Sequence, residues 1–314
     1  MLMPKKTSGL TLVELLAVLA TLSVLIGLLL PAIVSAREAA RRTQCTSNLR
    51  QLGLGVLGFE SAHRAFPASG WTHAGPGNPH GRFLGWRVLI LPYLDQQQLQ
   101  DLYDVSKNWW EAPNVSAASV PIDVFQCPSV PELAPVTFAT EHAPRPSMSF
   151  PIAVARTDYE ALLGIKPASI NLHLASPRYD STNRFSVMHR NSKNQMKDIR
   201  DGVSRTAFIS ECGGRPYVFR RKRRVENSND QGICWADSEG PFSLDGSSSD
   251  GSREGKGPAS RCTFGINRRN DNEPYSFHPD GASFLFADGR VSYMSEDTEL
   301  LVLVRLITRN GSER

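Results

Sequence analysis

The most distinct pattern in the chain is an uninterrupted apolar run near its start. From Leu15 to Val34 there are twenty residues without a charge, and the nearest acid is Glu14. Twenty residues of α-helix, at about 1.5 Å each, match the hydrocarbon thickness of a bilayer. A helix also satisfies its own backbone hydrogen bonds in lipid. The run therefore predicts one transmembrane helix.

A second, amphipathic pattern follows the apolar run, over residues 35–63. Its apolar residues recur at spacings of three and four, which places them on one face of a helix: Leu49, Leu52, Val56 and Phe59. We expect the helix to continue beyond the membrane and to bury this stripe against a sheet.

The remainder of the chain, residues 64–314, alternates short apolar segments with turn residues. Residues 86–91 (WRVLIL) are apolar enough for a buried strand, and residues 206–210 (TAFIS) are strand-like. The predicted fold class is therefore α+β. It combines a long N-terminal α-helix, with a membrane half and an amphipathic half, and an antiparallel β-rich head on which that helix packs.

The clearest local signal is a hairpin near the C-terminal end. Asp288-Gly289 separates two strand-like segments, and an Asp-Gly pair is a strong signal for a two-residue loop, in which both residues need positive φ. Such a loop places Phe286 opposite Val291. In that register one face of the hairpin carries the side chains that pack on a core: Phe284, Phe286, Val291 and Tyr293.

The residues of the N-terminal run leave several interpretations open. A cleaved secretory signal peptide has an apolar core of about 7–15 residues, which is shorter than this one, although a small-x-small site follows at residues 34–36. An ordinary uncleaved anchor is the second interpretation. Basic residues lie on both sides of the run, so their count does not decide the orientation.

A third interpretation rests on a resemblance. Residues 5–9 (KKTSG) and residues 10–14 (LTLVE) are similar to the processing site of type IV pilin-like proteins, the prepilins and pseudopilins. The resemblance implies cleavage after Gly9 by a prepilin peptidase and a methylated mature chain that begins at Leu10, where the family usually has Phe. Glu14 then falls fifth in the mature chain, where the family has its Glu.

The same resemblance implies a topology. Residues 1–9 form a leader on the inner side, residues 10–34 cross the inner membrane, residues 35–63 form the amphipathic helix, and residues 64–314 form a head in the periplasm or at the cell surface. Pro31 falls twenty-second in the mature chain, where many pilins have a helix-bending proline.

The position of Glu14 is informative without any family. A carboxylate near the start of a membrane helix is costly unless it finds a partner. The N-terminal amine of Leu10 on the next subunit would supply one. The alternative is that Glu14 lies near the headgroups and reaches water.

A second resemblance covers nearly the whole chain. His278, nine further residues and Asp288-Gly289 look like the H-x9-DG region at the C-terminus of a large family of pilin-like proteins of unknown function, the DUF1559 family. Other segments fit the same resemblance: residues 36–42, Cys45, Asn48-Leu49, Trp86-Arg87, Cys127-Pro128, Asp201-Gly202 and residues 207–211.

His278 and Asp288 are not expected to form a catalytic pair. A strand of five residues spans about 17 Å, so one flat hairpin keeps their side chains apart. We expect His278 to cap a loop, and Asp288 and Gly289 to make the turn.

Composition narrows the function class. The chain has 314 residues and a formal net charge of +4, which does not indicate a dedicated nucleic-acid binder. Residues 220–224 (RRKRR) are five consecutive cations. Such a run is usually a solvated loop, and it is also able to contact lipid headgroups or an anionic polymer.

Five cysteines are present, and none forms a C-x-x-C pair, so their spacing does not indicate a zinc ribbon: Cys45, Cys127, Cys212, Cys234 and Cys262. An extracytoplasmic head allows one or two disulfides, and the odd count leaves at least one thiol unpaired. The sequence alone does not give the connectivity.

No motif indicates an enzyme. G-x-S-x-G, H-E-x-x-H and the P-loop are missing from the sequence. Residues 53–58 match G-x-G-x-x-G, but a helix rather than a strand precedes them, so we expect either small residues where the helix packs closely on a sheet or a frayed helix end. We therefore expect no catalytic, cofactor-binding or metal-binding residues.

Two functions from different classes remain. The first is a structural subunit that assembles with other pilin-like subunits, in a type II secretion or type IV pilus-like assembly. The second is a head that binds a surface ligand such as a polysaccharide, or hydrolyses one, and uses the helix only as an anchor. Self-association that depends on Glu14 would distinguish the first from the second.

Overall fold

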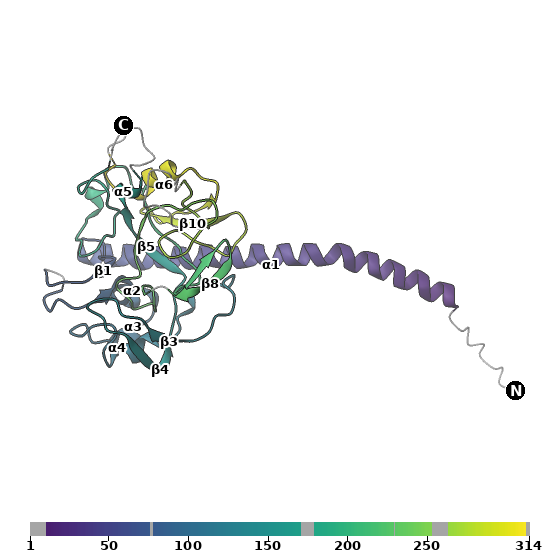
Figure 1. The fold of residues 1–314 in the computed structure, drawn as a ribbon, viewed down its shortest axis with the longest axis horizontal. Coiled ribbons are helices and arrows are strands. Elements are labelled where there is room, and N and C mark those ends of the chain that lie inside the picture. Colours follow the sequence, from purple (N-terminus) through teal and green to yellow (C-terminus); the bar gives the residue numbers. More distant parts are fainter. Residues whose placement is uncertain (1–10, 76–77, 171–178, 229, 253–262, 312–314) are drawn as a thin grey trace. The chain divides into compact units, whose positions relative to one another are not determined.

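The computed structural model describes residues 11–75, 78–170, 179–228, 230–252 and 263–311 (Figure 1). The chain forms two compact units, residues 1–43 and residues 44–314. We call the second unit the head, and it adds residues 44–63 to the head predicted from the sequence. The predicted leader, and with it Gly9 and Leu10, lies outside the described residues.

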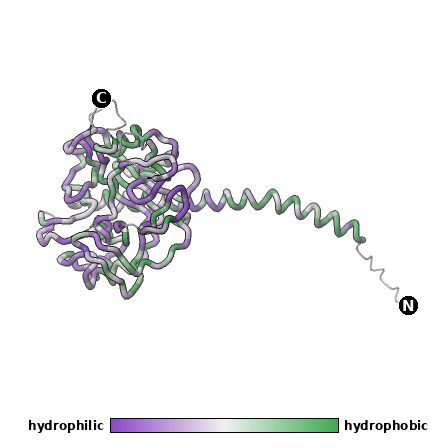
Figure 2. Tube along the Cα trace, viewed as in Figure 1, coloured by the Kyte–Doolittle hydropathy of each residue, from purple (hydrophilic) through white to green (hydrophobic). Residues whose placement is uncertain are grey.

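Helix α1 (Leu12–His63) continues through both apolar patterns and through Pro31 without interruption. Within the first unit, all the large apolar side chains from Leu12 to Val34 are exposed, each by 46% or more. Figure 2 shows this stretch as mainly hydrophobic. Among the described residues, α1 is the one helix long and apolar enough to cross a membrane, as judged by length and composition. A kink at Pro31 stays a prediction.

The part of α1 within the head has one buried stripe. Leu49, Leu52 and Val56 are fully buried, as their spacing predicts, and Phe59 is half-buried. Arg50 on the opposite face is exposed. The apolar stripe is extended by Cys45, which the periodicity argument did not include.

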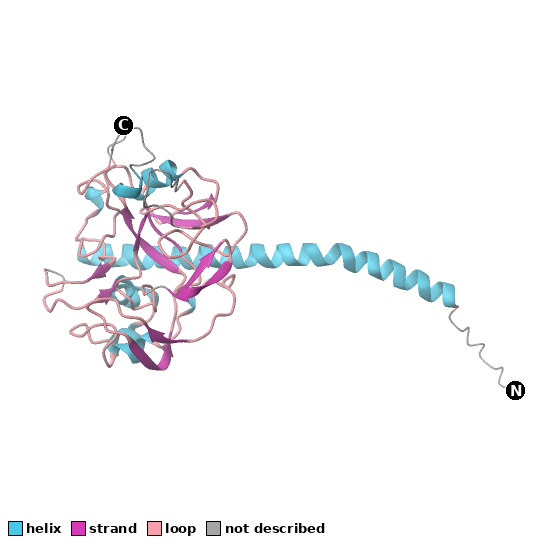
Figure 3. Cartoon of the chain, in the orientation of Figure 1, coloured by secondary structure: helices cyan, strands magenta, loops and turns pink. Residues whose placement is uncertain are grey.

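The centre of the head is a five-stranded sheet in the order β11-β10-β6-β5-β9. Figure 3 shows the strands of the head among short helices and loops. Neighbouring strands are antiparallel except for β5 and β9, which are parallel. The strands are β5 (Tyr159–Ile165), β6 (Ala207–Glu211), β9 (Phe242–Leu244), β10 (Gly281–Phe286) and β11 (Val291–Ser295). The predicted α+β class with an antiparallel β-rich head is confirmed.

Shorter elements surround this sheet. Three two-stranded sheets pair β1 (Gly70–Trp71) with β2 (Leu84–Gly85), β3 (Val136–Ala139) with β4 (Met148–Val154), and β7 (Tyr217–Arg220) with β8 (Arg223–Ser228). The short helices are α2 (Trp86–Ile90), α3 (Gln97–Asp101), α4 (Asn114–Ala118), α5 (Pro167–Ile170) and α6 (Leu300–Ile307). Single 3-10 turns are η1 (Leu91–Leu94), η2 (Asp123–Phe125) and η4 (Met196–Asp198).

The sheet separates two apolar clusters. The larger cluster contains the buried stripe of α1 together with Leu285 of β10 and Ile209 of β6. The smaller cluster contains α6 together with Phe284 and Phe286 of β10. Because side chains alternate along a strand, consecutive residues of β10 enter different clusters. The head is therefore layered, with α1 on one face of the sheet and α6 on the other.

The strand predicted for residues 86–91 is wrong, because these residues form α2 and the start of η1. A short buried helix and a buried strand carry the same continuous apolar pattern, so periodicity does not separate them. The helical conformation directs Arg87 into the interior, where its side chain is fully buried.

The predicted register of the C-terminal hairpin is also wrong by one residue. Leu285 pairs with Val291, and Phe286 bonds to Arg290, so the loop has three residues rather than two. Within this loop only Gly289 has a positive φ, of 84°, which fits a three-residue loop that ends in a left-handed glycine. Phe284 and Phe286 therefore lie on one face of the hairpin, and Val291 on the other.

The G-x-G-x-x-G pattern, residues 53–58, lies entirely within α1. A Cβ at Gly53 would lie 2.9 Å from Cδ1 of Leu285, and one at Gly55 would lie 3.0 Å from Cδ2 of Leu94. The glycines let the helix approach β10 and η1 closely. The interpretation of these residues as a close helix contact is confirmed.

Candidate functional site

The two ends of the H-x9-DG region lie in different environments. Asp288 is at the exposed tip of the β10–β11 hairpin, where its Oδ1 accepts a hydrogen bond of 2.9 Å from the backbone N–H of Arg290. His278 precedes β10 and is fully buried. The structure thus separates these two residues, as the strand length predicted.

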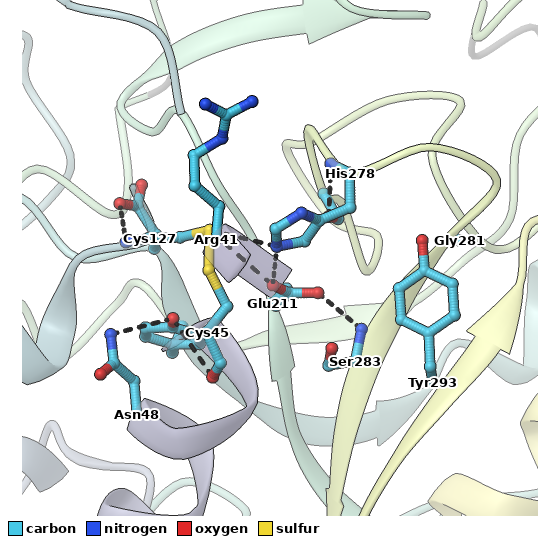
Figure 4. Close-up of polar contacts among 12 residues, drawn as sticks. Arg41, Cys45, Asn48, Cys127, Glu211, His278, Gly281, Ser283 and Tyr293 are labelled. Carbon is cyan, nitrogen blue, oxygen red and sulfur yellow. Dashed lines mark hydrogen bonds and ion pairs between the residues drawn. A yellow bond between two sulfur atoms is a disulfide. The ribbon is translucent and has the colours of Figure 1, made fainter. Parts of the chain in front are cut away.

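His278 instead faces a buried cluster (Figure 4). Its Nε2 lies 3.3 Å from Oε1 of Glu211 and 3.5 Å from Sγ of Cys127. Cys127 forms a disulfide with Cys45. All four residues are at most 3% exposed. We refer to Cys45, Cys127, Glu211 and His278 as the Cys-Glu-His cluster.

Each member of the Cys-Glu-His cluster comes from a different part of the chain. Cys45 belongs to the buried stripe of α1, and Cys127 follows η2. Glu211 is the last residue of β6, and its other oxygen, Oε2, accepts a 2.6 Å hydrogen bond from the N–H of Ser283 on β10. The central sheet therefore fixes the carboxylate, and the disulfide attaches α1 to the loop beside it.

Asn48 adds a second connection between α1 and the same loop. Its Nδ2 donates to the carbonyl of Gln126 at 2.8 Å and to the hydroxyl of Tyr159 at 3.3 Å. Burial raises the pKa of Tyr159 well above its ordinary range, and the charge of Glu211 adds to the effect. The phenol therefore stays protonated and keeps its hydrogen-bonding role at neutral pH.

Asp158 holds the loop from its other side. Its carboxylate accepts from the backbone N–H of Cys127 at 2.9 Å and from that of Gly214 at 3.1 Å. Burial raises the pKa of Asp158, while Arg156, 3.5 Å away, and the two N–H donors act in the opposite direction. The carboxylate thus joins the disulfide loop to the segment that follows β6.

The resemblance segment Trp86-Arg87 supplies a second buried polar contact. Arg87 makes an ion pair of 2.8 Å with Glu160, and both side chains are at most 1% exposed. The guanidinium also donates to the backbone carbonyls of Tyr159 and Trp235. Burial raises the pKa of Glu160, and the charge of Arg87 opposes that rise. The pair connects α2 to the central strand β5.

The basic run, residues 220–224, is not a simple loop. It forms the turn between β7 and β8, with positive φ at Arg221 and Lys222. Residues 221–224 are exposed. The ammonium of Lys222 donates to the backbone carbonyl of His278 at 2.8 Å. One cation of the run thus lies directly beside the Cys-Glu-His cluster.

At the other end of the chain, Glu14 has a local role that the sequence argument did not identify. Its Oε2 accepts from the N–H and the hydroxyl of Thr11, both at 2.8 Å, and its own N–H donates to Oγ1 of Thr11 at 3.2 Å. This is a capping box, and the Thr-x-x-Glu pattern in the sequence is the signal that would have revealed it. Glu14 caps the first turn of α1.

Sequence reasoning did not find the Cys-Glu-His cluster, because local spacing reveals only ligands that are close in sequence. Cys45 and Cys127 are separated by 82 positions, and His278 lies 151 positions after Cys127. The remaining thiols of Cys212 and Cys234 are free and buried, and burial raises the pKa of both. Cys262 lies outside the described residues.

A comparison with models of known protein families agrees with the resemblance to the DUF1559 family. The model of the family described as proteins of unknown function (DUF1559) matches residues 34–301, which include the Cys-Glu-His cluster, the Arg87–Glu160 pair and the C-terminal hairpin. No curated protein and no solved structure matches the chain. The match covers most of the chain, and the protein therefore belongs to the DUF1559 family.

Proposed function

We propose that this protein is a membrane-anchored, pilin-like structural subunit that a prepilin peptidase processes after Gly9. The observation that carries the proposal is the surface of α1 from Leu12 to Val34, which is apolar on every side and packs against nothing in the described chain. Such a surface is stable in lipid or against other apolar helices, and not in water. The head then lies on the outer side of the inner membrane.

The geometry of Glu14 supports assembly with other subunits. Both hydrogen bonds from Thr11 go to Oε2, so Oε1 makes no hydrogen bond within the described residues. A carboxylate accepts several hydrogen bonds at once. Glu14 is therefore able to cap its own helix while Oε1 accepts the N-terminal amine of Leu10 on a neighbouring subunit.

We also propose that the head is structural rather than enzymatic. The Cys-Glu-His cluster holds an imidazole and a carboxylate, but both are fully enclosed. A general acid or base has to reach its substrate within hydrogen-bonding distance. Burial of His278 and Glu211 therefore supports a role in holding α1, the sheet and the loop of Cys127 together.

Processing is tested on the full chain, produced in cells with an active or an inactive prepilin peptidase. Intact mass and N-terminal sequencing of the membrane fraction should show a methylated chain that begins at Leu10 only with the active peptidase. The variant Gly9→Leu should keep its leader, because a bulky side chain replaces the glycine at the cut. An intact Met1 with active peptidase, or a cut near Ala36, would contradict the proposal.

Assembly is tested with two variants that separate the roles of Glu14. Glu14→Gln keeps the capping box, since Gln serves at that position, but removes the charge. Thr11→Ala removes the cap and keeps the charge. Cross-linking in membranes should show oligomers for the wild type and Thr11→Ala and a loss of at least tenfold for Glu14→Gln. Equal oligomers in all three would argue for a helix that serves only as an anchor.

A pocket in the head favours ligand binding as the second candidate function. It has a volume of about 330 Å³ and is lined by Phe59, Phe66, Trp71, His63 and Lys193 among others. Aromatic faces beside a cation suit the rings of an acidic polysaccharide. Binding of a uronic-acid polymer by the detergent-solubilised chain, lost in Lys193→Ala and retained in Glu14→Gln, would support this function.

A further inference from the structure

The Cys-Glu-His cluster has the composition of a metal site. The ligand atoms of Cys45, Cys127, Glu211 and His278 all lie within 4.8 Å of one another, and all four residues are buried. Two sulfurs, one imidazole nitrogen and one carboxylate oxygen provide four donors. Zinc binds four such donors in a tetrahedron, and sulfur-rich sets favour it over magnesium or calcium.

The three distances among Cys127 Sγ, Glu211 Oε1 and His278 Nε2 are close to those of a tetrahedral zinc site. With zinc bonds of about 2.0 Å to nitrogen and oxygen and about 2.3 Å to sulfur, the N–O separation is about 3.3 Å and an S–N or S–O separation about 3.5 Å. The structure has 3.3 Å between His278 Nε2 and Glu211 Oε1, and 3.5 Å between Cys127 Sγ and that Nε2. The distance from Cys127 Sγ to Glu211 Oε1 is 3.9 Å. A tetrahedral zinc site has a sulfur–oxygen separation of about 3.5 Å.

The two sulfurs form a disulfide in the structure, and Cys45 Sγ lies within 4.8 Å of the ligand atoms of both Glu211 and His278. A disulfide and a zinc dithiolate use the same sulfurs and exclude each other. Two zinc-bound sulfurs lie about 3.8 Å apart. The Cα atoms of Cys45 and Cys127 are 5.4 Å apart, so rotations of the two side chains are sufficient to separate the sulfurs that far. The backbone need not move.

The surroundings orient the donors and moderate their charge. The N–H of Ser283 holds Oε2 of Glu211 at 2.6 Å, which directs Oε1 to the centre of the cluster. Outer contacts of this kind keep metal ligands in place. Zinc with two thiolates, one carboxylate and a neutral imidazole has a net charge of −1. The ammonium of Lys222, 2.8 Å from the carbonyl of His278, is a nearby compensating cation.

We propose that the dithiol form of this chain binds one zinc ion through Cys45 Sγ, Cys127 Sγ, Glu211 Oε1 and His278 Nε2. Cysteines enter a new chain as thiols, so this form needs no reductant. Binding replaces two S–H bonds by two Zn–S bonds and releases two protons, with no change of oxidation state. Oxidation of the two thiols by an external thiol oxidant gives the disulfide instead and removes two of the four ligands. The inference does not depend on the proposed assembly.

The experiment compares two forms of the same full-length protein in detergent. One is purified without oxygen in a phosphine reductant, and the other is oxidised, with the loss of two hydrogen atoms confirmed by mass. The reduced chain should bind about one zinc per chain and the oxidised chain less than a tenth of that, by elemental analysis. Cobalt in place of zinc should give a thiolate-to-cobalt charge-transfer band and the visible bands of a tetrahedral site. The affinity for zinc should decrease as the pH is lowered, because protons then compete with zinc for the sulfurs.

Variants then assign the ligands. Cys45→Ser and Cys127→Ser should lose the cobalt charge-transfer intensity of one sulfur each, and His278→Gln and Glu211→Gln should weaken zinc at least tenfold. Cys212→Ser, Cys234→Ser and Cys262→Ser are matched controls that should bind zinc as the wild type does. Reduced wild-type protein without zinc would overturn the proposal, as would zinc bound equally by the oxidised form. These two outcomes use the wild-type chain, so they hold even where a variant fails to fold.

Discussion

The two halves of α1 share one continuous backbone and meet opposite environments. From Leu12 to Val34 every large apolar side chain is exposed and the apolar surface surrounds the helix. From Gln44 to His63 an apolar stripe is buried in the head, and Leu54 lies exposed outside it. The first half is suited to a bilayer, whereas the second is held by a folded domain.

The difference shows how one helix is stabilised by two mechanisms. In the head, glycines allow close contact, and Cys45 and Asn48 fix α1 to the loop of Cys127. The outer half has no such contacts among the described residues, and its specific polar feature is the capping box of Thr11 and Glu14. Substitutions in one half should therefore leave the properties of the other unchanged.

The largest effect is expected from charges in the outer half. Each arginine at the centre of a membrane helix costs about 2.5–3.5 kcal/mol of insertion free energy. The double variant Leu22→Arg, Leu25→Arg should therefore be absent from the membrane fraction. The measurement is the amount of protein that sediments with the membranes. Leu54→Arg is the control in the head half, because Leu54 is 69% exposed and should tolerate the change. Normal membrane insertion of the double variant would refute the assignment of this half to lipid.

The next effect concerns the link between α1 and the head. Removing the disulfide with Cys45→Ser releases a loop closed over a separation of 82 residues. Loop-closure entropy then predicts a loss of about 4.5 kcal/mol in the free energy of unfolding. The free energy of unfolding is measured on the oxidised chain by guanidinium unfolding, with tryptophan fluorescence as the probe. Cys212→Ser, a free buried thiol, should cost much less, and an equal loss in both variants would count against the disulfide as the cause.

A matched glycine pair compares the halves directly. Ala favours a helix over Gly by about 1 kcal/mol. A Cβ at Gly27 meets nothing within 4 Å, so Gly27→Ala should leave the free energy of unfolding of the head unchanged and keep the chain in the membrane. At Gly53 the Cβ lies 2.9 Å from Leu285, and overpacking should make Gly53→Ala destabilising by about 1–2 kcal/mol. Thermal unfolding of both variants is the measurement, and a stabilised Gly53→Ala head would contradict the close contact.

Counted per pH unit, the smallest effect is a pH dependence that belongs to the head alone. Burial raises the pKa of Glu239 from 4.5 to about 7, and the nearby charge of Asp237 adds to the rise. The folded head therefore binds more protons than the unfolded chain between these values. Its free energy of unfolding should fall as pH rises through this window, by at most about 1.4 kcal/mol per pH unit.

The variant Glu239→Gln isolates this contribution. His189, whose pKa burial lowers to about 4, adds stability as pH rises and so acts in the opposite direction in the same window. Subtracting the free energy of unfolding of Glu239→Gln from that of the wild type cancels the contribution of His189, because both chains contain it. Chemical unfolding at pH 4, 5.5 and 7 should show the difference, and a difference that is constant with pH would exclude Glu239 as its source.

Much of the fold follows from local patterns, and the failures have a common cause. The stripe of Leu49, Leu52 and Val56 was predictable because a helix repeats its own contacts every three or four residues. The helical conformation of residues 86–91 was not predictable, because a continuous apolar run fits a short buried helix and a buried strand equally. The hairpin was predictable in place but not in register, because Asp-Gly occurs in loops of two residues and of three.

The membrane-length apolar run, the amphipathic half of α1, the α+β class and the family resemblance are all readable from the amino-acid sequence. These depend on residues near one another in the chain, where helix period, turn chemistry and motif spacing act. The meeting of His278 with Glu211 and the Cys45–Cys127 disulfide, and the pairing of Arg87 with Glu160, arise from the folded arrangement. The sheet and the packing of α1 on it bring these residues together across 67 positions (Glu211 and His278) to 151 positions (Cys127 and His278), and no local pattern carries that information.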